Sequence, residues 1–196
     1  MAEIPSEAKA VLDVWFGADG TPERWQPREA WFRKDDAFDA SIARQFAPLL
    51  ETALQGGLAD WQAAPQPALA RIVLLDQFTR NAFRGTPRAF AGDALAIEAA
   101  RAMVASGQDM RLAPVARAFV YLPFEHAEDL AAQDESVRLF SALEGTAPEV
   151  QGMLDYALRH RAIIERFGRF PHRNAVLGRS TTPEEAEFLL QPGSSF

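Results

Sequence analysis

The sequence predicts an all-α protein of about eight helices, paired as stacked antiparallel hairpins and joined by short loops. Apolar residues recur at helical spacing along most of the chain, and no segment alternates with period two for long enough to form a convincing strand. Proline and capping residues precede these periodic segments, and glycine follows several of them. With 196 residues, 48% of them hydrophobic, one core can form, so we expect a single helical domain over 1–196.

The first two helices are expected near the N-terminus. Apolar residues at i, i+3 and i+4 predict a helix over 6–16, with Ser6 as its cap and Gly17 as its end. The same spacing predicts a second helix over 38–53, which Pro48 should kink or split because proline lacks the N–H of an interior position.

The middle of the chain predicts three more helices. Proline is favourable in a first turn, so a third helix is expected to open at Pro67 and to run up to the segment 76–81. A fourth should start at Thr86 with the proline that follows it and stop at Gly107, and Pro114 should start a short fifth.

The last third of the chain predicts three longer elements. A long helix is expected over 123–143, ended by Gly145. The sequence at 146–149 has the pattern of a capping box and should open the next helix, which Gly168 ends. A second capping box at 182–185 should open the last helix.

Composition excludes several functions. The formal charge is −7 and the pI is about 5.0, which argues against a general nucleic-acid binder. No apolar run approaches a membrane span, and residues 1–5 lack the features of a secretory signal, so we expect a cytoplasmic protein. The absence of cysteine excludes disulfides, thiolate metal sites and cysteine nucleophiles. Phosphate-loop, dinucleotide and serine-hydrolase motifs are also absent, and no cofactor is predicted.

A basic segment interrupts this acidic chain. Residues 159–179 hold six arginines against one acid, Glu165, which gives +5. Because a guanidinium binds a carboxylate or a phosphate through two parallel hydrogen bonds, this segment predicts an anion site that includes Arg169, His172, Arg173 and Asn174. The alternative is that each arginine pairs with a neighbouring acid.

Two histidines are predicted to point inward. His160 lies on the apolar stripe of its helix, and His126 lies on the apolar side of the preceding one. A hairpin about Gly145 would bring both, with Glu125, toward the start of the basic segment. Three interpretations stay open: ordinary core histidines, a metal site without the usual His spacing, or an acid–base site beside a cation.

A second group of polar residues follows the third helix. Asp76 and Arg80 are four residues apart, which by itself predicts an ordinary helix ion pair. Asn81 and Arg84 continue the group into a segment that we expect to be irregular, where binding groups tend to be held.

Five strings along the chain are similar to a known family. They are VLDVWFG at 11–17, LLDQFTRN at 74–81, LPFEHAED at 122–129, FGRFPHRN at 167–174 and LGRSTTPEE at 177–185. In this order they resemble the domain-of-unknown-function family number 924 over essentially the whole chain. The resemblance implies a fold like that of tetratricopeptide repeats (TPR) and implies no established activity.

The sequence thus leads to three candidate functions. The first is binding of a small anionic ligand by Arg80, Arg84, Arg169 and Arg173, oriented by Asn81 and Asn174, with Glu125, His126 or His160 as proton-transfer groups. The second is a TPR-like module whose arginines bind an acidic peptide. The third is a metal-dependent hydrolase, although no metal ligands are assigned.

Overall fold

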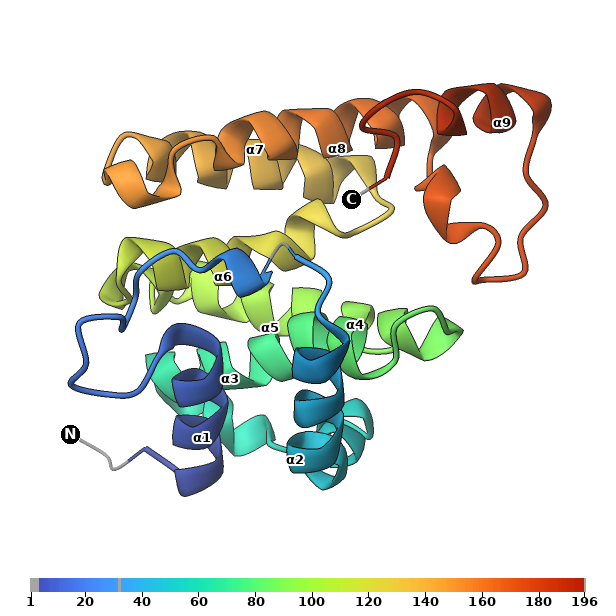
Figure 1. The fold of residues 1–196 in the computed structure, drawn as a ribbon. Coiled ribbons are helices and arrows are strands. Elements are labelled where there is room, and N and C mark those ends of the chain that lie inside the picture. Colours follow the sequence, from blue (N-terminus) through green and yellow to red (C-terminus); the bar gives the residue numbers. More distant parts are fainter. Residues whose placement is uncertain (1–3, 32, 196) are drawn as a thin grey trace.

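The computed structural model describes residues 4–31 and 33–195, and over these residues the chain is helical and contains no strand (Figure 1). The all-α prediction is therefore confirmed. Residues 1–3, part of the segment expected to lack a secretory signal, lie outside this description. No helix within the described ranges is long and apolar enough to cross a bilayer. The α-helices are α1 (Ser6–Phe16), α2 (Asp36–Leu54), α3 (Pro65–Val73), α4 (Thr79–Ala82), α5 (Asp93–Ala105), α6 (Pro114–Glu125), α7 (Leu130–Glu144), α8 (Met153–Phe167) and α9 (Pro183–Leu189).

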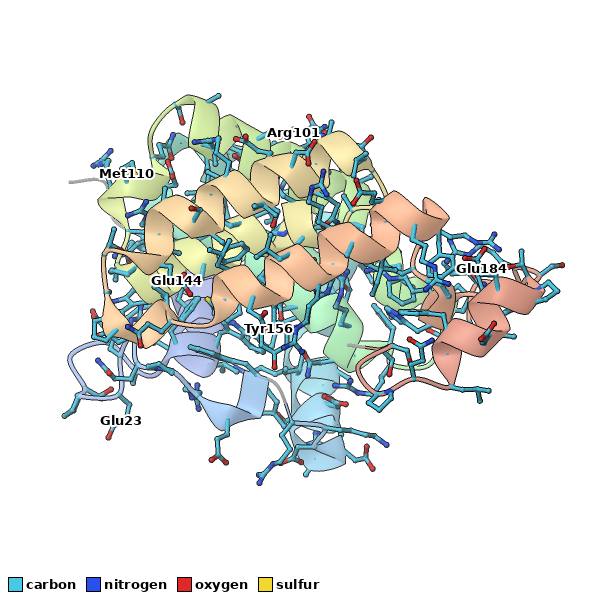
Figure 2. All side chains as sticks on the ribbon, turned by 90° about the horizontal axis from the view of Figure 1, so that it is seen from above. Glu23, Arg101, Met110, Glu144, Tyr156 and Glu184 are labelled. Atoms are coloured by element: carbon cyan, nitrogen blue, oxygen red, sulfur yellow. The ribbon has the colours of Figure 1, made fainter. Side chains whose placement is uncertain are left out.

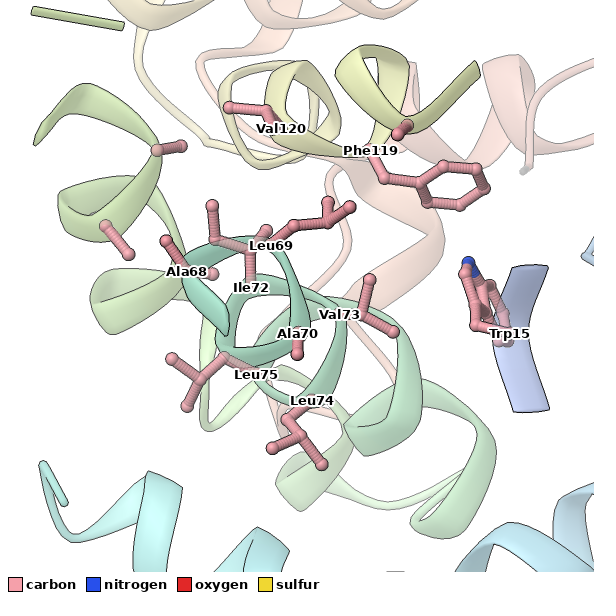
Figure 3. Close-up of a cluster of buried hydrophobic side chains, with 14 of the residues drawn as sticks. Trp15, Ala68, Leu69, Ala70, Ile72, Val73, Leu74, Leu75, Phe119 and Val120 are labelled. Atoms are coloured by element: carbon pink, nitrogen blue, oxygen red, sulfur yellow. The ribbon is translucent and has the colours of Figure 1, made fainter. Parts of the chain in front are cut away.

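Helix α3 lies at the centre of the main core. Its residues 67–73 are all buried, as expected of a helix that has neighbours on every side. Helices α1, α5 and α6 pack against it, and Figure 3 shows Leu69, Ile72 and Val73 facing different neighbours. Trp15 of α1 meets Phe119 of α6 edge to face, with ring centroids 5.7 Å apart. This arrangement places the C-terminal end of α3 inside the protein.

A π-helical turn continues α3. Residues Leu74–Phe78 form this turn, and α4 follows it directly. The sequence predicted a helix only up to the segment 76–81 and an irregular stretch after it, whereas the chain stays helical through Ala82. Gly92 packs against it so closely that a Cβ atom there would lie 2.1 Å from the carbonyl oxygen of Leu75. Only glycine fits this contact, which sets where α5 begins, at Asp93. The expected start of that helix at Thr86 is wrong, because Pro87–Phe90 form a separate 3₁₀ turn.

The expected helix over 123–143 is also wrong. Pro123 lies in the last turn of α6, and the chain turns before Asp129, whose carboxylate accepts a 2.8 Å hydrogen bond from the backbone of Ala132 and caps α7. Gln133 donates to the carbonyl oxygens of Glu125, at 2.6 Å, and Ala127, at 2.8 Å. These bonds satisfy the end of α6.

Four other local signals are tested by the structure. Pro48 does not split α2, which runs as one helix to Leu54. The capping box expected at 146–149 does not form, because Thr146 donates its hydroxyl to the carbonyl of Leu143 and α8 begins later, at Met153. The box at 182–185 is confirmed at the start of α9. The third helix starts at Pro65, two residues before the expected Pro67.

From the end of α8 onward, the chain packs apart from the main core. Helices α7 and α8 lie side by side, and α9 lies beyond the end of α8, where Glu184 is labelled in Figure 2. Here a small separate cluster forms from Ile163, Ile164 and Phe170, joined by Phe167 and Phe188. We call residues 168–182 the C-terminal segment.

Candidate functional site

The carboxylate of Asp76 is the centre of a buried polar cluster. Asp76 lies on the π-helical turn and is 1% exposed. Its Oδ1 atom is 3.0 Å from Nη1 of Arg80 and 2.7 Å from Nδ1 of His126. Burial by itself would raise the pKa of Asp76, but these two neighbours and Gln77 lower it. Asp76 is therefore ionised at neutral pH.

Arg80 links Asp76 to the start of α5. Its guanidinium binds both carboxylate oxygens of Asp93, at 2.8 and 3.1 Å. It also donates to the backbone carbonyl of Asp76 at 2.6 Å. Two acids and one backbone oxygen thus surround this arginine, and the close packing of Gly92 places the second acid where Arg80 can reach it.

Asp76 determines the tautomer of His126. An ionised carboxylate only accepts hydrogen bonds, so Nδ1 of His126 carries the proton and donates it to Asp76. The remaining nitrogen, Nε2, is then a proton acceptor. Burial lowers the pKa of His126 more than Asp76 raises it, and Arg80 lowers it further. The imidazole is therefore neutral at pH 7.

His160 and Glu125 form a second buried pair beside the first. Nδ1 of His160 is 2.8 Å from the carbonyl oxygen of Tyr156 and 3.1 Å from Oε1 of Glu125. Burial lowers the pKa of His160 to about 3, and burial together with the charge of Asp76 raises the pKa of Glu125 to about 8. At neutral pH both groups of this contact are uncharged. The rings of His126 and His160 lie 6.4 Å apart.

Arg173 enters the cluster from the C-terminal segment. It is 7% exposed, and its Nη1 atom is 3.5 Å from Oδ2 of Asp93. Its guanidinium carbon lies 4.8 Å from the ring centroid of Phe90 and 4.4 Å from that of Phe170. Burial, followed by the charge of Arg80, lowers the pKa of Arg173 to about 10. The Nε atom is buried and has no hydrogen-bond partner in the described chain.

His172 lies next to Arg173 in the same 3₁₀ turn, Pro171–Arg173. Its ring is 5.7 Å from that of Phe170. Burial and the charge of Arg173 lower the pKa of His172 to about 4. We use the name Asp76 cluster for Asp76, Arg80, Asp93, Glu125, His126, His160 and Arg173.

The structure places four other candidates elsewhere. Asn81 and Arg84 both bind Asp39, at 2.7 and 2.6 Å, and so tie the end of α4 to α2. Arg169 binds Glu185 through two nitrogens, at 2.6 and 2.8 Å, and Asn174 donates to the same carboxylate at 3.2 Å. These contacts hold the C-terminal segment to α9. The expected clamp of four arginines therefore does not gather on one point.

Several residues of the site were not singled out from the sequence. Asp93, Phe90 and Phe170 contact the arginines of the cluster, and no motif marks them. Glu128 holds the C-terminal segment in place. It accepts a 2.7 Å hydrogen bond from the backbone N–H of Phe170 and binds Arg179 at 2.6 and 3.0 Å. Its place two residues after His126 was the available signal.

Metal-ligating geometry was also considered. Within residues 4–31 and 33–195, no group of three or more His, Cys, Asp or Glu side chains is arranged to hold a metal ion. The histidines of the Asp76 cluster instead face carboxylates and a backbone carbonyl through Nδ1.

Comparisons with known proteins place the chain in a family. A family model described as a bacterial protein of unknown function, DUF924, matches residues 11–193. The chain is also similar to a solved structure, the protein of unknown function ATU0120 from Agrobacterium tumefaciens, with 41% identity and a TM-score of 0.81 over 93% of this chain and 96% of that one. The search of curated proteins gives no match. On the family match and the extent of this similarity, the chain belongs to the DUF924 family of bacterial proteins.

Proposed function

We propose that this protein binds a small anionic ligand at the Asp76 cluster, with Arg173 as the cation that holds the ligand and His126 as the group that exchanges a proton with it. The observation that supports the proposal is the incomplete hydrogen bonding of the buried Arg173 side chain. This guanidinium is buried, yet within residues 4–31 and 33–195 its Nε has no partner and its nearest carboxylate oxygen is 3.5 Å away.

Buried charges in proteins are ordinarily paired and hydrogen-bonded, because desolvation of an unpaired ion is costly. The carboxylate in contact with Arg173 belongs to Asp93, and Arg80 already binds both of its oxygens, while Glu128 and Asp76 act on Arg173 through their charge. Arg173 is therefore the least satisfied cation of the cluster. An anionic ligand would supply the missing acceptor.

The same cluster supports proton transfer. Asp76 holds His126 as a neutral imidazole whose Nε2 is a proton acceptor, and Glu125 remains a protonated acid near pH 7. Two groups whose environments push their pKa values in opposite directions are suited to the roles of base and acid. We assign the base role to His126 and the donor role to Glu125, with His160 orienting Glu125.

The test measures thermal unfolding with increasing sulfate, phosphate or acetate at constant ionic strength, with chloride as reference. We expect at least one of these anions to raise the Tm of the wild-type protein by binding the folded state. Arg173→Gln should abolish the rise. Arg138→Gln, at an exposed arginine that binds Glu135, is the matched control and should leave it unchanged.

The folded state of each variant is checked by circular dichroism, and Arg173→Lys provides a second variant that keeps a positive charge. Equal stabilisation of the wild type and both Arg173 variants by every salt would contradict the proposal. Such a result would assign the effect to general salt action.

A further inference from the structure

We infer that the ligand of the Asp76 cluster is a singly charged organic carboxylate that binds the edge of Arg173 formed by Nε and Nη2. This inference rests on the proposed function and names its ligand class. It follows from three features of the site: the hydrogen-bonding edge, the charge of the cluster and the apolar surface beside it.

The first feature is the edge itself. Four other arginines of the described chain bind a carboxylate through Nε and Nη2 together: Arg84 binds Asp39, Arg138 binds Glu135, Arg166 binds Glu184 and Arg169 binds Glu185. Arg173 turns Nη1 toward Asp93, and its Nε has no partner. Arg173 is the most buried of these five arginines, and there the edge that elsewhere takes a carboxylate is unused.

The second feature is charge. Arg80 and Arg173 balance Asp76 and Asp93, and Glu125 and His126 are both uncharged at pH 7. The cluster is therefore neutral before a ligand enters. Asp76 and Asp93 repel any anion in the site. The repulsion energy is about twice as large for a doubly charged phosphate or sulfate as for a singly charged ligand. Charge thus favours a monocarboxylate over a dianion.

The third feature is the apolar lining. Phe170 is fully buried, Phe90 is half-buried, and both rings contact the guanidinium of Arg173. The hydrocarbon part of an organic acid can pack against these phenyl rings and bury their apolar surface. An inorganic oxyanion has no hydrocarbon and cannot do so. A carboxylate with a short alkyl body therefore fits better than acetate or phosphate.

Entry to this edge involves the C-terminal segment. Because Nε is buried, a carboxylate reaches it only when the segment that carries Arg173 shifts. Gly168 and Gly178 bound this stretch with φ of +68° and +65°, and both lie in open space. Backbone freedom at these two glycines lets the segment move, and the Glu128 contacts with Phe170 and Arg179 hold it in place until it does.

The experiment compares binding of butyrate, acetate, phosphate and sulfate by calorimetric titration at pH 7 and constant ionic strength. We expect butyrate to bind wild-type protein at least tenfold more tightly than phosphate or sulfate, and more tightly than acetate. Arg173→Lys should reduce the preference for butyrate over phosphate, because an ammonium lacks the two-donor edge. Phe90→Ala should reduce the preference for butyrate over acetate, and Arg138→Gln should change neither.

The outcomes separate this inference from the proposed function. Phosphate or sulfate that binds as tightly as butyrate, and that depends on Arg173, overturns the carboxylate assignment and leaves the anion site in place. Absence of Arg173-dependent binding for all four anions overturns both.

Discussion

Nδ1 of His126 donates a 2.7 Å hydrogen bond to Oδ1 of Asp76, although 50 positions separate the two residues in the chain. The bond joins the end of α6 to the π-helical turn that follows α3. π-helical turns are rare and frequently occur at functional sites, so this contact lies where the fold itself points to a site.

The histidines should titrate below the ordinary value of 6.5. Burial lowers the pKa of His126 and His160, the latter to about 3. Proton NMR titration, with signals assigned through His126→Gln and His160→Gln, measures both. The charged and titratable groups around His126 are Asp76, Arg80, Arg173 and His160.

In Asp76→Asn the pKa of His126 should fall further, because the carboxylate that favours the imidazolium is gone. Two histidines that titrate independently near 6.5 would contradict the acid–base interpretation of the cluster. They would then be separate core residues.

Loss of the central carboxylate should destabilise the protein. Asp76→Asn leaves Arg80 and His126 without a buried anion, and we expect the free energy of unfolding to fall by about 3 kcal/mol. Urea denaturation measures this change. The matched control is Asp155→Asn, which removes an exposed ion pair with Arg159 and should cost less than about 1 kcal/mol. Similar losses in the two variants would argue against a central role for Asp76.

Glu125 should make stability depend on pH in a characteristic direction. The folded protein keeps the Glu125 proton up to about pH 8, whereas the unfolded chain releases it near 4.5. Between these values the folded state binds more protons, so this group lowers the free energy of unfolding as pH rises.

Glutamine does not ionise, so Glu125→Gln should gain stability relative to wild type across this window, by on the order of 4 kcal/mol in total. Urea denaturation at several pH values between 5 and 8 checks the sign. Parallel pH profiles of the two proteins would show that Glu125 titrates normally.

Glu128 should control the local stability of the C-terminal segment. Its carboxylate binds both the Phe170 amide and Arg179. The separate cluster around Phe170 offers few other apolar contacts. Because hydrogen bonds to charged groups contribute about 1.5–3 kcal/mol, Glu128→Ala should speed amide exchange of the segment roughly tenfold or more.

Hydrogen–deuterium exchange followed by mass spectrometry reports on this segment directly. Glu135→Ala, at a half-buried glutamate that binds Arg138, is the matched control and should leave the segment unchanged. Unchanged exchange in Glu128→Ala would mean that other contacts hold the segment.

Gly92→Ala should be strongly destabilising. The added methyl group would lie 2.1 Å from the carbonyl oxygen of Leu75, so the backbone must move, at a cost of about 2 kcal/mol or more. Gly145→Ala is the control, since its Cβ meets no neighbour and its φ is −73°. Thermal unfolding of the two variants should therefore differ in Tm by several degrees. Equal Tm values would show that the turn at Leu75 adapts without cost.

Much of the fold follows from local patterns in the sequence. The span of α1, the cap of α9 at Thr182 and the inward orientation of His160 follow from residues a few positions apart, although Ser6 is the first residue of α1 and not its predicted cap. Helical periodicity and capping act within one or two turns, so a single sequence reveals them. The capping-box pattern at 146–149 is an exception, because the chain forms a 3₁₀ turn there and no box. A local pattern therefore sets the structure only where tertiary contacts agree with it.

The site depended on contacts that no local pattern encodes. Arginines in the basic segment look alike in the sequence, yet Arg169 finds Glu185 whereas Arg173 is buried against two phenyl rings. Asp93 reaches Arg80 because Gly92 lets α5 start against a π-helical turn. The sequence by itself therefore determined the helices and the inward histidines. Only the tertiary structure decided which acid meets which base, because ion pairing depends on distances of a few ångströms between elements far apart in the chain.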